Sequence, residues 1–153
     1  MANRTVRHYW EASALIPLFK QEETSWDCRK LAEAAAEGNS IIVTSAIGLV
    51  EVAKGEGTRS AMQAIADFFE NPFIEVVELD RRLALLARNA YWEHGIHPHD
   101  AVHLVTAIDS GCDRLWTTDP HLLKHNGIAN LAILRPKCEG QLGLPDTTPK
   151  AES

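Results

Sequence analysis

Four acidic residues lie within apolar or small-residue segments, where a carboxylate is costly unless another group compensates its charge. They are spread over the whole chain: Glu11, Glu51, Asp100 and Asp119. A shared counter-ion explains four such residues better than four separate helix caps do. Carboxylate oxygens are hard ligands that suit Mg²⁺ or Mn²⁺, and a natural reaction for such a site is hydrolysis of a phosphodiester.

The elements that must bring these acids together alternate between strand and helix patterns. Short segments rich in β-branched and aromatic residues predict strands at 6–10, 40–44, 73–79, 114–117 and 131–134. Helical spacing and helix-end signals predict helices at 12–19, 25–37, from 45 onward, 58–70, 80–95, 98–111 and 121–125. This alternation predicts an α/β fold, with a mostly parallel sheet and helices on both faces.

Residues with known helix-end preferences set most of these boundaries. The expected N-terminal residues are Thr24 with Ser25, Ser45, Thr58 and Asp80. Gly38 and Gly95 mark the ends of two helices, since glycine readily adopts the left-handed conformation found there. Pro17 either lies in the first turns of its helix or kinks it.

The predicted elements carry all four acids to one edge of the sheet. Glu11 directly follows the first strand, and Asp119 follows the fourth by about two residues. Asp100 lies in the first turn of its helix, and Glu51 lies more than a turn into the helix after the second strand. In open α/β sheets ligands bind beyond the carboxyl ends of the strands, so the four side chains can share one site.

Each acid also has an ordinary structural explanation when it is taken alone. Asp100 could favour the helix dipole, and Glu51 could be a half-exposed helix residue. Asp119 before Pro120 is typical of a turn or a cap. Glu11 is harder to explain in this way, because core-forming residues lie on both sides of it. The joint pattern therefore favours a shared site.

Composition fits one compact domain in the cytoplasm. The chain has 153 residues, of which 45% are hydrophobic and 24% are charged. It contains no apolar run long enough to span a bilayer, and its N-terminus lacks the apolar region of a signal peptide. Three cysteines without metal-type spacing fit a reducing compartment.

The net charge of −6 includes the four acids, and without them 17 acidic residues stand against 15 basic ones. Charge therefore leaves a nucleic-acid partner open.

Four segments together resemble the PIN domain family, and more narrowly the VapC-type toxin ribonucleases of bacterial toxin–antitoxin pairs. They are Trp-Glu-Ala-Ser-Ala-Leu at 10–15, Thr-Ser-Ala-Ile-Gly-Leu-Val-Glu-Val at 44–52, His-Asp-Ala-Val-His-Leu-Val-Thr-Ala-Ile at 99–108 and Leu-Trp-Thr-Thr-Asp at 115–119. The resemblance runs from about Arg7 to Leu134. It implies a three-layer α/β/α sandwich in a PIN-like nuclease domain over 1–135. The remaining residues, 136–153, have the composition of a loosely ordered tail.

The resemblance implies that Glu11, Glu51, Asp100 and Asp119 are catalytic metal ligands. Ser13 and Thr117 stand where the family has small hydroxyl residues that orient these ligands. Glu11 departs from the family pattern, which has Asp at this position. Its additional methylene moves the carboxylate outward unless the side chain folds back, and Mg²⁺ tolerates little geometric error.

The resemblance further implies a Mg²⁺- or Mn²⁺-dependent endoribonuclease that cuts RNA with a metal-activated water and leaves 5′-phosphate and 3′-hydroxyl ends. It also implies an antitoxin protein that blocks the acidic pocket, and a homodimer. Lys20, Lys54 and Arg59 could hold backbone phosphates or could be ordinary solvated cations. Apolar residues on the second helix could serve a dimer or the core: Trp26, Leu31 and 34–36.

Two other functions remain open. His94, His97, His99 and His103 cluster in the sequence, and the i, i+4 spacing of His99 and His103 is one that zinc hydrolases use. The glutamate that follows the first histidine in the zinc motif is missing. Alternatively, the chain could be a catalytically impaired PIN scaffold that acts mainly by binding another protein, an alternative that Glu11 keeps open.

Overall fold

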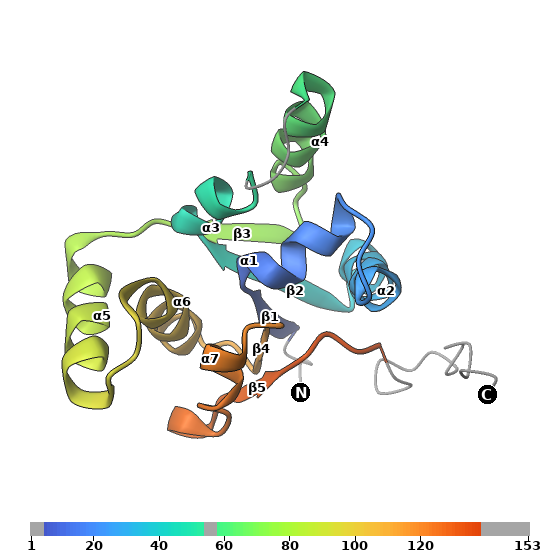
Figure 1. Ribbon diagram of the computed structural model, residues 1–153. Helices are drawn as coiled ribbons and strands as arrows, with labels where there is room; N and C mark the ends of the chain where they lie inside the picture. The colour runs from blue at the N-terminus through green and yellow to red at the C-terminus, as the bar shows by residue number, and fades with distance from the viewer. Residues whose placement is uncertain (1–4, 54–57, 139–153) are drawn as a thin grey trace.

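A parallel sheet lies at the centre of the molecule (Figure 1). The computed structural model describes residues 5–53 and 58–138. Within these residues five strands lie in the order β3-β2-β1-β4-β5, and every neighbouring pair is parallel. The strands are β1 Val6–Trp10, β2 Ser40–Ser45, β3 Ile74–Val77, β4 Arg114–Trp116 and β5 Ala132–Leu134.

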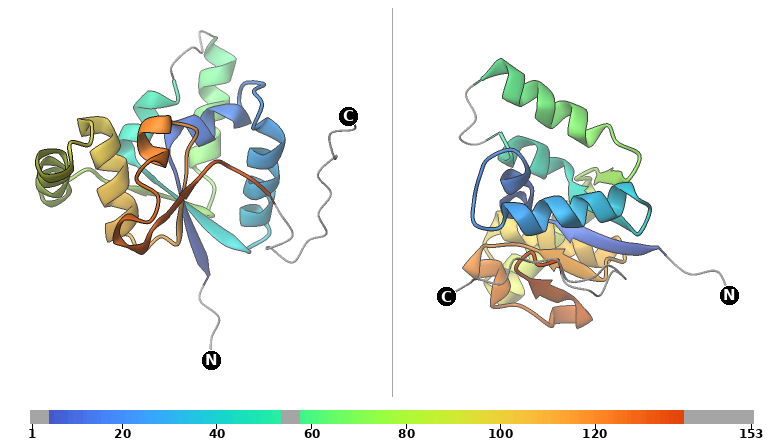
Figure 2. Two further views of the ribbon diagram at one scale, coloured as in Figure 1. Left: turned by 60° about the horizontal axis from the view of Figure 1, so that its bottom comes forward. Right: turned by 90° about the vertical axis from the view of Figure 1, so that its right-hand side faces the viewer.

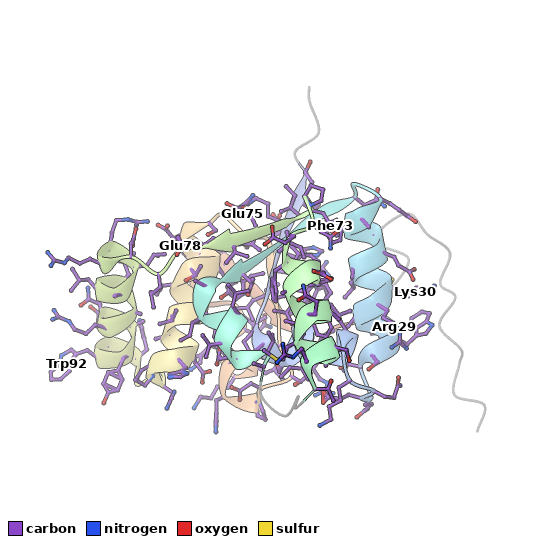
Figure 3. The ribbon with its side chains drawn as sticks, turned by 90° about the horizontal axis from the view of Figure 1, so that it is seen from above. Arg29, Lys30, Phe73, Glu75, Glu78 and Trp92 are labelled. Atoms are coloured by element: carbon purple, nitrogen blue, oxygen red, sulfur yellow. The ribbon has the colours of Figure 1, made fainter. Side chains whose placement is uncertain are left out.

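Helices cover both faces of this sheet. In the described residues they are α1 Ala12–Leu15, α2 Ser25–Ala36, α3 Ala46–Glu51, α4 Arg59–Phe69, α5 Arg81–His94, α6 Pro98–Asp109 and α7 Pro120–Leu123, with 3₁₀ helices η1 Ile16–Leu18 and η2 Ile128–Asn130. Helices α5 and α6 lie on one side of the sheet, and α2 and α4 lie on the other (Figure 2, Figure 3). The predicted three-layer α/β/α sandwich is therefore confirmed. None of the helices in the described part of the chain is both long and apolar enough to cross a membrane.

Alternation along the strands divides the core into two halves. On β1, Tyr9 packs with residues of α5 and α6, whereas the next residue, Trp10, packs with residues of α1 and α2. On β2, Val43 and Ile42 divide in the same way. Successive side chains of a strand point to opposite faces, so the consecutive apolar residues within these strands reflect burial on both faces.

Most of the predicted helix ends are confirmed. Ser45, Thr58 and Asp80 each accept a backbone N–H bond at the start of a helix. Gly95 ends α5 with a positive φ of 65°, the conformation that favours glycine. These boundaries were predictable because capping depends on residues that are adjacent in sequence.

Several element ends differ from the prediction. Pro17 divides the predicted helix 12–19 into α1 and η1, since proline removes a backbone donor. Thr24 precedes α2 without a side-chain capping bond. Instead, the Ser25 hydroxyl accepts from the Glu22 N–H at 2.8 Å. The third strand covers only the middle of the predicted range 73–79.

The apolar residues of α2 lie mainly in the core. Leu31, Ala34 and Ala35 are buried, and Trp26 packs against the same core while partly exposed. Ala36 is exposed. The sequence left open whether these residues serve a dimer or the core, and their burial favours the core.

The end of the described chain packs against α2. The backbone N–H of Cys138 donates to the Asp27 carboxylate at 2.9 Å, and Cys138 belongs to the core that α2 helps to form. The rest of the predicted tail, 139–153, lies outside the described residues.

Candidate metal centre

The register of the sheet brings the ends of three strands to one level. Trp10 at the end of β1 pairs with Trp116 at the end of β4, so Glu11 and Thr117 leave the sheet side by side. The Glu11 N–H donates to the Trp116 carbonyl at 3.1 Å. Strand β2 ends beside them at Ser45, which also begins α3. This edge is the carboxyl end of the sheet, where the sequence predicts the site.

Glu11 is held by hydrogen bonds from the chain around it. Its Oε2 atom accepts from the Ser13 N–H at 3.0 Å and from the Thr117 hydroxyl at 2.9 Å, and the Ser13 hydroxyl also donates to it. The side chain therefore folds back as the N-cap of α1 and is 7% exposed. Its extra methylene is accommodated in this way, and Oε1 accepts no hydrogen bond from the described residues.

The Thr117 hydroxyl joins two of the acidic segments, and replacing it should weaken both. Besides donating to Glu11, it accepts from the Asp119 N–H at 3.0 Å, and Thr117 is fully buried. In Thr117→Val the shape is preserved, but the buried Glu11 carboxylate and the half-buried Asp119 N–H each lose a hydrogen bond, so we expect a loss of about 1–3 kcal/mol in the free energy of unfolding. Urea denaturation measures this loss. Thr117→Ser keeps the hydroxyl and should recover most of it, and equal losses in both variants would contradict this explanation.

Glu51 reaches the same edge from the last residue of α3. Its Oε1 lies 2.6 Å from Nε2 of His103, and its Oε2 lies 3.7 Å from Nδ1 of His99. Burial by itself would raise the pKa of Glu51, but the hydrogen bond and charge of His103, together with His99, outweigh burial and lower it. One oxygen of Glu11, one oxygen of Glu51 and one nitrogen of His103 lie within 4.8 Å of one another.

Gly48 allows α3 to lie close to β2 and so sets the position of Glu51. A Cβ atom at residue 48 would lie 2.9 Å from Oγ1 of Thr44, which itself donates to the Trp10 carbonyl. We expect Gly48→Ala to displace α3 and cost about 1–3 kcal/mol in unfolding free energy. If the clash is the cause, the same substitution should cost less in a Thr44→Ala background, as a double-mutant cycle would measure. An unchanged cost would rule out this contact.

Asp100 and Asp119 complete the acidic group. Asp100 lies in the first turn of α6, and Asp119 caps α7 by accepting from the His121 N–H at 2.9 Å. Burial raises the pKa of Asp100, and the charge of Asp119, a hydrogen bond with Asp119 and the charge of Glu11 raise it further. Like charges have this effect when no cation compensates them, so the carboxylates are close enough to form one electrostatic unit.

A pocket of about 470 Å³ lies over this acidic group. Glu51, Asp100 and Asp119 line it, whereas Glu11 lies outside the lining and accepts hydrogen bonds from Ser13 and Thr117. The remaining polar lining is rich in imidazoles: His97, His99, His121 and His125, with Lys124 beside them. The structure therefore brings the four predicted acids and both predicted hydroxyl residues to one edge of the sheet.

The predicted phosphate-binding cations do not line this pocket. Lys20 and Arg59 are exposed and lie outside its lining, and Lys54 lies outside the described residues. Lys124, which the sequence did not single out, does line the pocket. Its position five residues after Asp119, around the short helix that Asp119 caps, is the signal that could have identified it.

His99 and His103 differ sharply in environment, although the sequence pairs them as zinc-ligand candidates. The His103 side chain is 1% exposed, whereas that of His99 is 59% exposed. Both approach the carboxylate of Glu51. Nδ1 of His103 lies 2.5 Å from the Tyr9 hydroxyl, a contact that sequence reasoning missed. The available signal was Tyr9 itself, because a buried tyrosine hydroxyl usually needs a partner.

Comparison with known families identifies the class of protein that this fold and site define. The PIN domain profile matches residues 9–128, most of the chain. The chain belongs to the PIN domain family, as its sequence indicates. A comparison with curated proteins gave no match.

Solved structures with the same fold include two bacterial proteins. One is VapC20 from Mycobacterium tuberculosis, described as a toxin that cleaves the sarcin–ricin loop, with a TM-score of 0.65 and 17% sequence identity over 76% of this chain and 93% of that one. The other is FitAcB from Neisseria gonorrhoeae, with a TM-score of 0.58 and 14% identity over 84% and 97% of the two chains. At these identities the similarity shows a shared fold.

Proposed function

We propose that this chain is a Mg²⁺- or Mn²⁺-dependent endoribonuclease of the VapC type. The observation that carries the proposal is the convergence of Glu11, Glu51, Asp100 and Asp119, from four separate segments, at the carboxyl edge of the sheet. Membership of the PIN domain family supports a nuclease. The fold shared with VapC20, a toxin that cleaves RNA, supports a toxin.

The donor set fits a hard dication. Glu11 and Glu51 present carboxylate oxygens within 4.8 Å of each other, and oxygen ligands are those that Mg²⁺ and Mn²⁺ prefer. The raised pKa of Asp100 beside Asp119 is the electrostatic condition that a bound cation relieves. These four residues would hold the ion, which would polarise the scissile phosphate and lower the pKa of a bound water.

The protein's own groups would position the acids and the RNA. The hydroxyls of Ser13 and Thr117 hold Glu11 in place, an arrangement that supports ligand geometry. Lys124 and the imidazoles of the pocket lining are placed to contact backbone phosphates. The ion would supply an activated water, so no side-chain nucleophile would be needed. The proposed products carry a 5′-phosphate and a 3′-hydroxyl.

The proposed partners are an RNA substrate, a cognate antitoxin that covers the acidic pocket, and a second copy of this chain in a homodimer. The proposed location is the cytoplasm, where such an enzyme meets its RNA. An antitoxin with a basic side chain would complement the excess of carboxylates in the pocket.

The proposal is tested by incubating the purified chain with structured RNA in Mg²⁺, in Mn²⁺, and in EDTA. Cleavage that depends on the dication and leaves 5′-phosphate ends would support the proposal. Cleavage that persists in EDTA would contradict it. Stimulation by Zn²⁺ that is lost in His99→Ala and His103→Ala would support the zinc hydrolase instead. If the parent does not cleave RNA and an antitoxin partner still binds the Asp100→Asn variant, the result would support the impaired scaffold.

A further inference from the structure

A buried hydrogen-bonded chain of side chains lies behind Glu51. The Tyr9 hydroxyl lies 2.5 Å from Nδ1 of His103, and Nε2 of His103 lies 2.6 Å from Oε1 of Glu51. Tyr9 is 0% exposed and His103 is 1% exposed, so water does not compete for these bonds. The three residues belong to β1, α6 and α3, so tertiary packing alone brings them together.

The chemistry of Glu51 assigns the direction of the bond between Glu51 and His103. A glutamate carboxylate is ionised at neutral pH, and an ionised carboxylate only accepts hydrogen bonds. His103 must therefore donate from Nε2, in either protonation state of the ring. In the neutral ring Nδ1 then accepts from the hydroxyl of Tyr9, which lies 2.5 Å away. Each donor among Tyr9 and His103 thus faces an acceptor on the next side chain.

We propose that His103 is a positioning residue that holds the Glu51 carboxylate in the orientation for binding the dication, and that it is not itself a ligand. This inference rests on the proposed metal-dependent function. An imidazole nitrogen binds a metal through its lone pair. Although one nitrogen of His103 lies within 4.8 Å of a Glu11 and a Glu51 oxygen, a bare lone pair on Nε2 would face a carboxylate oxygen at 2.6 Å. The proton on Nε2 removes that conflict.

Two matched substitutions of His103 test which imidazole nitrogen matters for binding the dication. Glutamine can place its amide N–H near the position of Nε2, whereas asparagine reaches only the position of Nδ1. We expect His103→Gln to bind Mn²⁺ within about threefold of the parent, and His103→Asn and His103→Leu to bind about 10- to 100-fold more weakly. A role in packing alone would instead rank the variants by volume and stability, which thermal unfolding would measure in parallel.

Electron paramagnetic resonance of Mn²⁺ supplies the readout without any measurement of activity. Titration with Mn²⁺ gives the affinity from the signal of the free ion, and electron spin echo modulation detects a directly bound nitrogen. We expect the parent and His103→Gln to show the same nitrogen modulation, because His103 does not bind the ion. Modulation lost in that variant would overturn the proposal, because it would make His103 a ligand. Equal Mn²⁺ affinity in the parent, His103→Gln and His103→Leu would also overturn it.

Two further measurements keep the inference separate from the proposed function. A ¹H–¹⁵N correlation spectrum of the metal-free protein should show His103 with a proton on Nε2, and a neutral ring protonated only on Nδ1 would overturn the inference. Tyr9→Phe removes a single hydroxyl and should weaken Mn²⁺ binding less than His103→Leu does. If the parent binds no dication, the proposed function fails and the inference falls with it. If the parent binds and the variants do not differ, the inference alone fails.

Discussion

Asp100→Asn is expected to lower kcat/KM for metal-dependent RNA cleavage by about a thousandfold or more. Asparagine keeps the size of the side chain but removes a charge from the group that includes Asp119 and Glu11. The loss should appear with either Mg²⁺ or Mn²⁺, and a cleavage assay with the purified variant measures it. Cleavage at the parental rate would show that Asp100 is not part of the catalytic site.

The same substitution should not destabilise the metal-free protein. The pKa of Asp100 is raised above its ordinary value of 3.8, so the folded protein holds this proton more tightly than the unfolded chain does. The free energy of unfolding of the parent therefore falls as pH rises through the raised pKa. Asparagine avoids that loss, so we expect the difference in unfolding free energy between the variant and the parent to grow as pH rises from about 4 to 7. The comparison uses the difference in unfolding free energy between variant and parent. His8, whose pKa is lowered to about 4, also makes stability depend on pH, but it does so equally in both proteins. A difference that stays constant or shrinks as pH rises would contradict the repulsion between Asp100 and its acidic neighbours.

Glu11→Gln is the substitution with the second-largest expected effect, a loss of about 10²- to 10³-fold in cleavage. Glutamine keeps the length of the side chain and an oxygen that can accept from Ser13 and Thr117, but it has no charge for the ion. Its effect on cleavage should therefore come through metal binding, and the Mn²⁺ affinity should fall with it. A variant that cuts and binds Mn²⁺ as the parent does would remove Glu11 from the ligand set.

Glu11→Asp is the matched control for length. Aspartate keeps the charge and is a preferred N-cap, so we expect cleavage within about tenfold of the parent. A large gain would show that the native glutamate attenuates the enzyme, and a loss as deep as that of Glu11→Gln would show that length matters as much as charge. The comparison also tests the impaired scaffold, which predicts no cleavage in the parent and a gain in this variant.

The fold was largely predictable because its elements depend on local signals. The caps Ser45, Thr58 and Asp80 and the terminating Gly95 are adjacent to the helices that they delimit. Strand alternation with helices then implies a parallel sheet. Where prediction was wrong, competing interactions decided the ends, as at Thr24, where Ser25 instead accepts from Glu22.

The candidate site was predictable in part for a different reason. Residues that follow parallel strands reach the same edge, so the positions of Glu11 and Asp119 in the sequence are enough to group them. The surrounding side chains could not be placed in this way. Lys20 and Arg59 are near the site in sequence but do not line the pocket, whereas Lys124 does. Loop paths and side-chain directions, which periodicity does not encode, decide such positions.

By itself the sequence determined the order of elements, the residues that cap them and the carboxylates available for a cation. Only the tertiary structure decided that the Glu11 side chain folds back onto Ser13 and Thr117. It also decided that His103 is buried between Tyr9 and Glu51, while His99, one helical turn earlier, is exposed. The reason is physical: helix and strand formation depend on neighbours in the chain, whereas burial and hydrogen-bond direction depend on which distant segments pack together.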